Sequence, residues 1–254
     1  MPGRPYILDE LTWKTVRDTR YEVAVLPWGA TEAHNYHLPY STDNIETLAV
    51  VERAAERAWE AGAKVVVLPI VPFGVQTGQL DIPLCINMNP STQALVLRDV
   101  ASSLAGQGIK KLVVLNGHGG NDFRQMIREL QPHVSVFLCV VNWYRILDFQ
   151  AYFSDVGDHA GEMETSVMQH IAPERVLPLS EAGSGKARAF TIAAFREGWA
   201  WAPRQWTQVT EDTGVGNPAA STAEKGKRYV EAVSGTLGDF LVELAKADPK
   251  RLYE

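Results

Sequence analysis

The sequence predicts an α/β fold in which a mostly parallel sheet lies between two layers of helices. Short apolar, β-branched segments alternate with longer segments of helical composition through the first two-thirds of the chain. This alternation is typical of parallel strands joined by right-handed helical crossovers. The 254 residues can bury a sizeable core, and they contain neither an internal repeat nor a linker. We therefore expect one three-layer αβα domain over residues 1–254.

The elements follow from apolar runs and from the residues that end them. Strands are expected at Glu22–Gly29, Lys64–Val71, Lys111–Leu115 and His133–Val141. Helices are expected at Leu8–Thr19, Asn44–Ala61, Pro90–Gln107, Asp122–Leu130, Gly161–Ile171 and Ala219–Ala245, the last with a weak point at Ser234-Gly235. The intervening segments 73–89, 142–158 and 183–216 are long and irregular. Such loops in a compact domain are usually functional.

Composition narrows the class of protein. The chain is 46% hydrophobic and 21% charged, with a net charge of −6 and no concentrated Lys/Arg cluster, which argues against nucleic acid as a partner. Its apolar runs are too short to span a bilayer, so no membrane association is expected. The first residues include acids where a signal peptide needs an apolar core, and the two cysteines lie far apart. These features favour a reduced, cytoplasmic setting.

The stretch Leu26–Asp43 is unusually rich in metal-binding side chains. It carries Glu32, His34, His37 and Asp43 just past the first expected strand, and ligands bind at such strand ends in open α/β sheets. Glu32 and His34 are two residues apart and would lie on the same side of an extended segment. Carboxylate and imidazole together suit Zn, Mn or Fe. Asp43 and Glu46 have capping-box spacing, so Asp43 could cap the next helix, either alone or while also binding a metal.

A second motif, NGHGGN, follows the third expected strand and contains His118. Its glycines let the backbone approach a ligand closely, and the next helix start could bind an anion. The motif does not match the dinucleotide pattern GxGxxG. His118 is therefore a candidate metal ligand at the same edge of the sheet.

A third motif, DHAGEMETS, offers His159 and two glutamates. Ala160, Met163, Val167 and the residues that follow at helical spacing form an apolar stripe, and Glu164 falls within that stripe. A carboxylate on an apolar face must be paired or bound to metal, so Glu164 is the inward candidate, with an arginine salt bridge as the alternative. Glu162 shares the polar face with Ser166 and is expected at the surface or behind the site.

These motifs resemble the creatininase (creatinine amidohydrolase) family. The resemblance lies in LPWGATEAHNYHLPYSTD, LRDVASSLAGQGIKKLVVLNGHGGN and DHAGEMETS, with a weaker match in GVGNPAASTAEKGKRYVEA. The family includes creatininase, a formamide hydrolase of flavin and deazaflavin synthesis and a peptidase of mycofactocin maturation. The resemblance implies a metal-dependent hydrolase of C–N amide bonds on an α/β fold, often assembled as a hexamer, with a small-molecule amide as substrate.

Carried over by motif, the resemblance implies a site for two divalent ions, zinc, manganese or iron. Asp43 would bridge them, and the remaining implied ligands are Glu32, His34, His118 and Glu164. In creatininase another ligand glutamate follows the NGH histidine by two residues, where this chain has Gly120. Glu164, or else Glu162, is the candidate replacement. The creatininase tyrosine is also missing, at Gly119, which argues against creatinine as the substrate.

The expected chemistry is amide hydrolysis by water activated between two ions. Glu32 and His118 would hold one ion and His34 and Glu164 the other, while His159 would protonate the leaving nitrogen, a task that suits histidine near neutral pH. His37 is left with a role in the pocket or behind the metal ligands. Other readings are a non-catalytic protein that binds metal or a small ligand, and creatinine amidohydrolase proper. Pocket walls are expected from Trp143, Trp199, Trp201 or Trp206.

Overall fold

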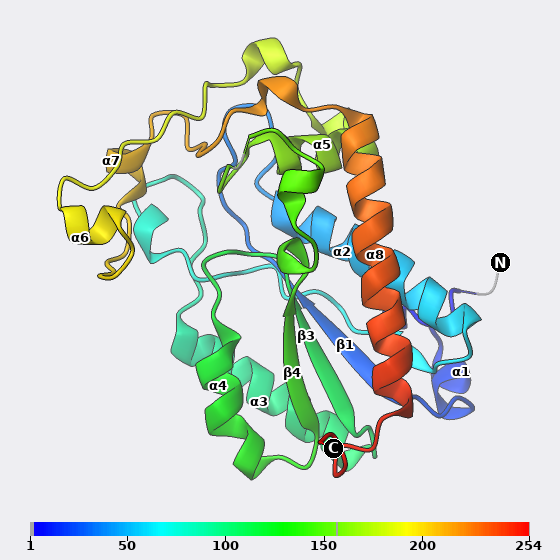
Figure 1. Cartoon of the computed structure of the whole chain (residues 1–254). Helices are drawn as coiled ribbons and strands as arrows, with labels where there is room; N and C mark the ends of the chain where they lie inside the picture. Colours follow the sequence, from blue (N-terminus) through cyan, green and yellow to red (C-terminus); the bar gives the residue numbers. More distant parts are fainter. Residues whose placement is uncertain (1–2, 156, 254) are drawn as a thin grey trace.

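A computed structural model describes residues 3–155 and 157–253, and its centre is a parallel four-stranded sheet (Figure 1). The strand order is β2-β1-β3-β4. The strands are β1 (Val23–Trp28), β2 (Val65–Val67), β3 (Lys111–Asn116) and β4 (Phe137–Asn142). Parallel pairing places Val25 beside both Val67 and Val113. The predicted α/β fold with a parallel sheet is confirmed.

Helices cover both faces of this sheet (Figure 1). One face carries α2 (Thr42–Glu60), α5 (Glu162–Ile171) and α8 (Ala223–Lys246), and the other carries α3 (Pro90–Gly106) and α4 (Phe123–Leu130). Successive strand residues enter opposite cores, since Val113 packs with α2 and α8 while Leu112 packs with α3 and α4. This alternation produces the predicted three layers.

Three predicted elements are shorter than expected, and proline accounts for two of them. The strand predicted over Lys64–Val71 is only β2, because Pro69 has no N–H to donate to a neighbouring strand. His133 does not begin β4 but ends a 3₁₀ turn that contains Pro132. The helix predicted at Leu8–Thr19 is a 3₁₀ turn, Leu8–Glu10, followed by α1 (Trp13–Arg17), whose N-cap is Thr12.

The closing helix α8 is continuous through Ser234 and Gly235, where a weak point was predicted. Its other small residues permit close packing, since a Cβ at Gly226 would overlap the backbone of Ser166 in α5. Its last turn is capped from the sheet, because Lys111 Nζ donates to the carbonyls of Leu244 and Ala245, both at 2.7 Å. These contacts fix α8 against the layer that carries the site.

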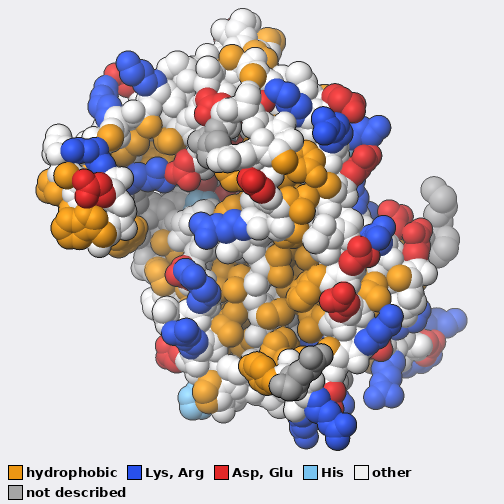
Figure 2. All heavy atoms as spheres, viewed as in Figure 1, with side chains coloured by type: hydrophobic (Ala, Val, Ile, Leu, Met, Phe, Trp, Pro, Cys, Tyr) orange, Lys and Arg blue, Asp and Glu red, His pale blue; other side chains and the backbone are white. Residues whose placement is uncertain are grey.

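The segment 183–216 remains largely irregular and extends to one side as a lobe that includes α6 (Ala193–Arg196) and α7 (Trp206–Val209) (Figure 1). Hydrophobic side chains gather on this lobe, where Ile192, Trp199 and Trp201 are exposed (Figure 2). None of the helices within residues 3–155 and 157–253 combines the length and the apolar character that crossing a bilayer requires.

Candidate active site

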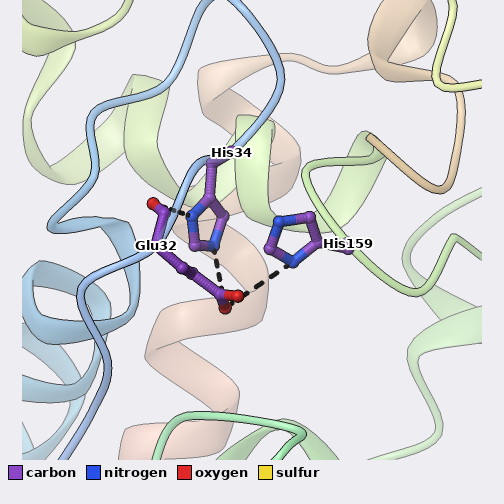
Figure 3. Close-up of side chains that lie close together, drawn as sticks. All are labelled: Glu32, His34 and His159. Atoms are coloured by element: carbon purple, nitrogen blue, oxygen red, sulfur yellow. Dashed lines mark hydrogen bonds and ion pairs between the residues drawn. The ribbon is translucent and has the colours of Figure 1, made fainter. Parts of the chain in front are cut away.

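Six ionisable side chains meet where the loops after β1 and β3 approach the start of α5. Glu32 and His34 follow β1, Asp43 lies in the first turn of α2, and His118 follows β3. His159 precedes α5 and Glu164 lies in its first turn. Figure 3 shows Glu32, His34 and His159 directed at one another. The structure thus brings together every side chain that the sequence proposed for the metal site.

Asp43 lies between the two histidines that the motifs singled out. One carboxylate oxygen is 3.0 Å from His34 Nε2, and the other is 2.9 Å from His118 Nδ1. The capping alternative for Asp43 is wrong, because α2 begins at Thr42 and its N-cap is Ser41. Asp43 is thus held by two buried histidines, and its role as a metal ligand stays a prediction.

Each of the three histidines in the cluster donates one ring N–H to a backbone carbonyl. His34 Nδ1 lies 3.1 Å from the oxygen of Glu32, His118 Nε2 lies 3.1 Å from that of Val75, and His159 Nε2 lies 2.7 Å from that of Ala33. A carbonyl only accepts hydrogen bonds, so these nitrogens carry protons. The other ring nitrogen of each histidine faces a carboxylate oxygen. In a neutral imidazole that nitrogen carries a lone pair, so it repels the oxygen unless a cation lies between the two atoms. Metal-binding histidines are held in this way.

The cluster concentrates negative charge in a dry environment. Burial raises the pKa of the Asp43 carboxyl, but His34 and His118 hold it well below its ordinary value. Burial likewise lowers the pKa of His34, yet Asp43 raises it to about 10. Nearby Glu46 is also buried, and burial together with Glu164 raises its pKa well above the ordinary value. So many carboxyl groups require positive charge among them, from protons or from metal.

Two triads of donor atoms share Asp43. Glu32, Asp43 and His118 form one triad, and His34, Asp43 and Glu164 form the other, each with its ligand atoms within 4.8 Å of one another. A third possible grouping contains Glu32, His34 and His159. Carboxylate oxygens and imidazole nitrogens at such spacing fit a divalent transition metal. The geometry therefore suits two ions around a common carboxylate.

Glu164 brings a carboxylate to the cluster from α5, whereas the residue two positions after His118 is Gly120. Glu164 Oε1 lies 3.9 Å from His34 Nε2, in the second triad. A Cβ at Gly120 would instead overlap the carbonyl of Val75 and lie 2.5 Å from His118 Nε2. Backbone from the irregular segment 73–89 therefore fills the space beside Gly120, and the role of Glu164 as the replacement ligand stays a prediction.

We expect Gly120→Ala to weaken metal binding by about 10- to 100-fold, the usual cost of disturbing a group that orients a ligand histidine. The added methyl must push Val75 away from His118. Gly119→Ala is the matched control, because its Cβ would meet nothing within 4 Å. Competition with a chromophoric chelator measures both affinities, and equal values for the two variants would contradict the expectation.

Two residues that the sequence did not single out hold Glu32 in place. Gln79 Nε2 donates to Glu32 Oε2, and the thiol of Cys85 donates to Gln79 Oε1 at 3.2 Å. The other oxygen of Glu32 is left facing His118 Nδ1 at 2.9 Å. Gln79 and Cys85 lie in the irregular segment 73–89, where no periodicity marks an inward residue. Only the length of that segment indicated a function.

Glu162 is buried, so of its two predicted places, at the surface or behind the site, the surface is wrong. Its side chain is fully buried and binds Lys225 Nζ, the Ser154 hydroxyl and the backbone N–H groups of Ser154 and Asp155. The polar face of α5 packs against α8 and its preceding loop, and Ser166 on that face accepts from the N–H of Thr222. Periodicity identified the apolar face but could not show that the polar face is also covered.

We expect Glu162→Gln to lower the free energy of unfolding by about 2 kcal/mol, less than for a fully buried pair because water partly screens Lys225. Burial raises the pKa of Glu162, but Lys225 and the loop donors hold it below its ordinary value. The stabilisation is therefore present at neutral pH and is lost as the pH falls below about 4. Urea unfolding at pH 7 measures it.

The exposed pair Arg57–Asp239, which joins α2 to α8, is the control for that experiment. Asp239→Asn should change the unfolding free energy by less than about 1 kcal/mol. An equal loss in the two variants would show that Glu162 contributes no more than a surface ion pair.

A cavity of about 880 Å³ adjoins the cluster. Five cluster residues line it, and aromatic walls come from Trp143, Trp201 and Trp206. Trp199 is exposed at 75% and lies elsewhere, so that part of the prediction is wrong. His37 also lies outside the lining, because its Nε2 contacts Thr165 Oγ1 at 2.9 Å in α5. The cavity lies near the upper end of the range for ligand pockets, roughly 300–1,000 Å³.

Comparison with known proteins agrees with this geometry. The family model Creatininase, described as creatinine amidohydrolase, matches residues 9–241. A mycofactocin precursor peptide peptidase from Mycolicibacterium smegmatis is 29% identical over 84% of this chain and 82% of its own length. A creatinine amidohydrolase from Pseudomonas putida is 28% identical over 69% of this chain and 66% of its own length.

Solved structures show the same fold. A Bacteroides fragilis protein provisionally assigned as a creatinine amidohydrolase is 43% identical, with a TM-score of 0.92 over 99% of this chain and 100% of its own. A creatininase manganese form is 22% identical, with a TM-score of 0.79 over 95% and 99% of the two chains. A mutant creatininase of Zn–Zn type has a TM-score of 0.77, also at 22% identity, over 95% and 98%. With the match over residues 9–241, these findings show that the chain belongs to the creatininase family of hydrolases.

Proposed function

We propose that this protein is a metal-dependent amidohydrolase that cleaves a C–N amide bond in a small or peptide-like molecule. The observation that carries the proposal is the orientation of His34 and His118. Each donates one N–H to a backbone carbonyl and directs its other nitrogen at the shared carboxylate of Asp43. Such preorganised donors are typical of metal ligands.

Glu32, Asp43 and His118 would hold one divalent ion, and His34, Asp43 and Glu164 the second. When bound, such ions make water acidic enough to react near neutral pH and polarise a carbonyl. Zinc and manganese are the candidates, because the donor set suits both and because related creatininase structures occur in Zn–Zn and manganese forms. Iron suits the same donors.

His159 would move the proton to the leaving nitrogen. Its Nε2–H is fixed on the carbonyl of Ala33, so Nδ1 is the atom free to exchange a proton, and it lies 3.8 Å from Glu32 Oε1. The ring is held between His34, at 4.1 Å, and the edge of Trp206, at 5.3 Å between centroids. The chain thus fixes the position and the tautomer of this imidazole before substrate binds.

The size of the cavity favours substrates larger than a single small ring. Its volume of about 880 Å³ would leave most of the space unfilled around creatinine. The relative from M. smegmatis is a precursor peptide peptidase, which also favours a substrate larger than a single small ring. We further propose a cytoplasmic homo-oligomer, and a hexamer in particular, on the family resemblance.

The test is metal analysis of protein purified without chelator, followed by a panel of cyclic amides, formamides and short peptides. About two ions per chain and metal-dependent hydrolysis of a panel member are expected. Bound metal with no hydrolysis of any member would favour a binding protein instead. Absence of bound metal after incubation with zinc or manganese would overturn the proposal.

A further inference from the structure

Gln76 is a buried amide with no partner for either polar atom. Its side chain is 4% exposed, and neither Oε1 nor Nε2 has a hydrogen bond within the described residues. Buried carboxamides are nearly always paired, so an unpaired one needs an explanation. Gln79, three residues on, shows the ordinary case, because both of its amide atoms are bonded.

Gln76 lines the cavity beside the cluster, and its backbone is fixed there. Its N–H donates to Asn87 Oδ1 at 2.7 Å, and the preceding N–H, of Val75, donates to Asn121 Oδ1 at 2.9 Å. The carbonyl of Val75 in turn accepts from His118. The unpaired amide is therefore held on the same short segment that orients a candidate metal ligand.

We propose that Gln76 is a specificity-determining residue that binds a primary carboxamide or a ring (cis) amide of the ligand. A carboxamide presents a donor and an acceptor side by side. A ligand group that offers an acceptor and a donor side by side can therefore bind Nε2 and Oε1 of Gln76 at once. A trans peptide group directs its N–H and C=O to opposite sides and would leave one Gln76 atom unpaired. The identification of this ligand as the substrate rests on the proposed function. The binding of an amide by Gln76 does not depend on it.

The experiment uses the metal-loaded protein and two matched probes, 2-pyrrolidinone and N-methyl-2-pyrrolidinone, in the second of which a methyl group replaces the hydrogen on the ring nitrogen. We expect the wild type to bind the first about tenfold more tightly, the size of one or two net hydrogen bonds. Gln76→Met should abolish the difference, and Gln107→Met, on the exposed end of α3, should retain it. Ligand-observed NMR reports both binding and hydrolysis.

A second readout separates recognition from a structural role. Gln76→Met removes an unsatisfied buried amide, so the Tm of ligand-free protein should stay the same or rise. A fall in Tm would indicate a structural role and would overturn the proposal. Equal binding of the two probes by wild type, or failure of both to bind, would also overturn it. Hydrolysis of no panel amide, with the probe preference intact, would contradict only the proposed function.

Discussion

Asp43→Asn is expected to lose bound metal and to lower the rate of amide hydrolysis by at least about a thousandfold, or about 4 kcal/mol of transition-state stabilisation. Asp43 is the residue common to both triads, with one oxygen beside His34 and the other beside His118. Asparagine keeps the shape but replaces one oxygen with an NH₂ group, which cannot accept from histidine or bind a cation. The measurement is metal content per chain together with the rate.

Thermal unfolding provides a readout of the same variant that does not depend on turnover. A ligand present at a thousandfold excess over its Kd stabilises the native state by about 4 kcal/mol, so a chelator should lower the Tm of the wild type clearly. Asp43→Asn should show a much smaller chelator effect. Asp99→Asn, at an exposed position of α3, is the control and should behave like the wild type. Unchanged metal stoichiometry in Asp43→Asn would disprove the shared-ligand role.

The sequence was informative where side chains follow regular elements. Glu32, His34 and His118 come directly after β1 and β3, and parallel neighbours place such residues at one edge of the sheet. Helical periodicity placed Glu164 on the inward side of α5, and its side chain is only 15% exposed. These positions follow from the geometry of strands and helices alone.

The sequence failed where position depends on what packs against an element. Periodicity separates apolar from polar faces, but only the approach of α8 makes the polar face around Glu162 a buried one. Gln79 and Gln76 lie in an irregular segment, where no repeating pattern relates sequence to direction. Their environment is set by contacts that no local pattern predicts, such as that of Asn121 with the backbone of Val75 and that of Asn87 with the backbone of Gln76.

His159→Gln is expected to lower kcat by about 10²- to 10⁴-fold while leaving the metal content unchanged. The glutamine NH₂ can take the place of Nε2–H and donate to the carbonyl of Ala33, so the loop before α5 should keep its position. What the variant lacks is the basic ring nitrogen Nδ1 that faces Glu32. The comparison of kcat, metal content and pH–rate profile with the wild type measures this loss.

The same variant decides between two roles that the geometry permits for His159. Its Nδ1 lies within reach of a grouping with Glu32 and His34, so the imidazole could be a third ligand on that side of the cluster. If His159 is a metal ligand, its replacement by glutamine would reduce metal affinity, and added metal would then restore part of the rate. A proton-transfer group would leave affinity intact, and no concentration of metal would restore the rate. His133→Gln, in the exposed turn before β4, controls for the substitution itself. His159 lines the cavity, and its Nδ1 lies 3.8 Å from Glu32 Oε1, farther than the 3.0 and 2.9 Å at which His34 and His118 face Asp43, so we expect the second outcome.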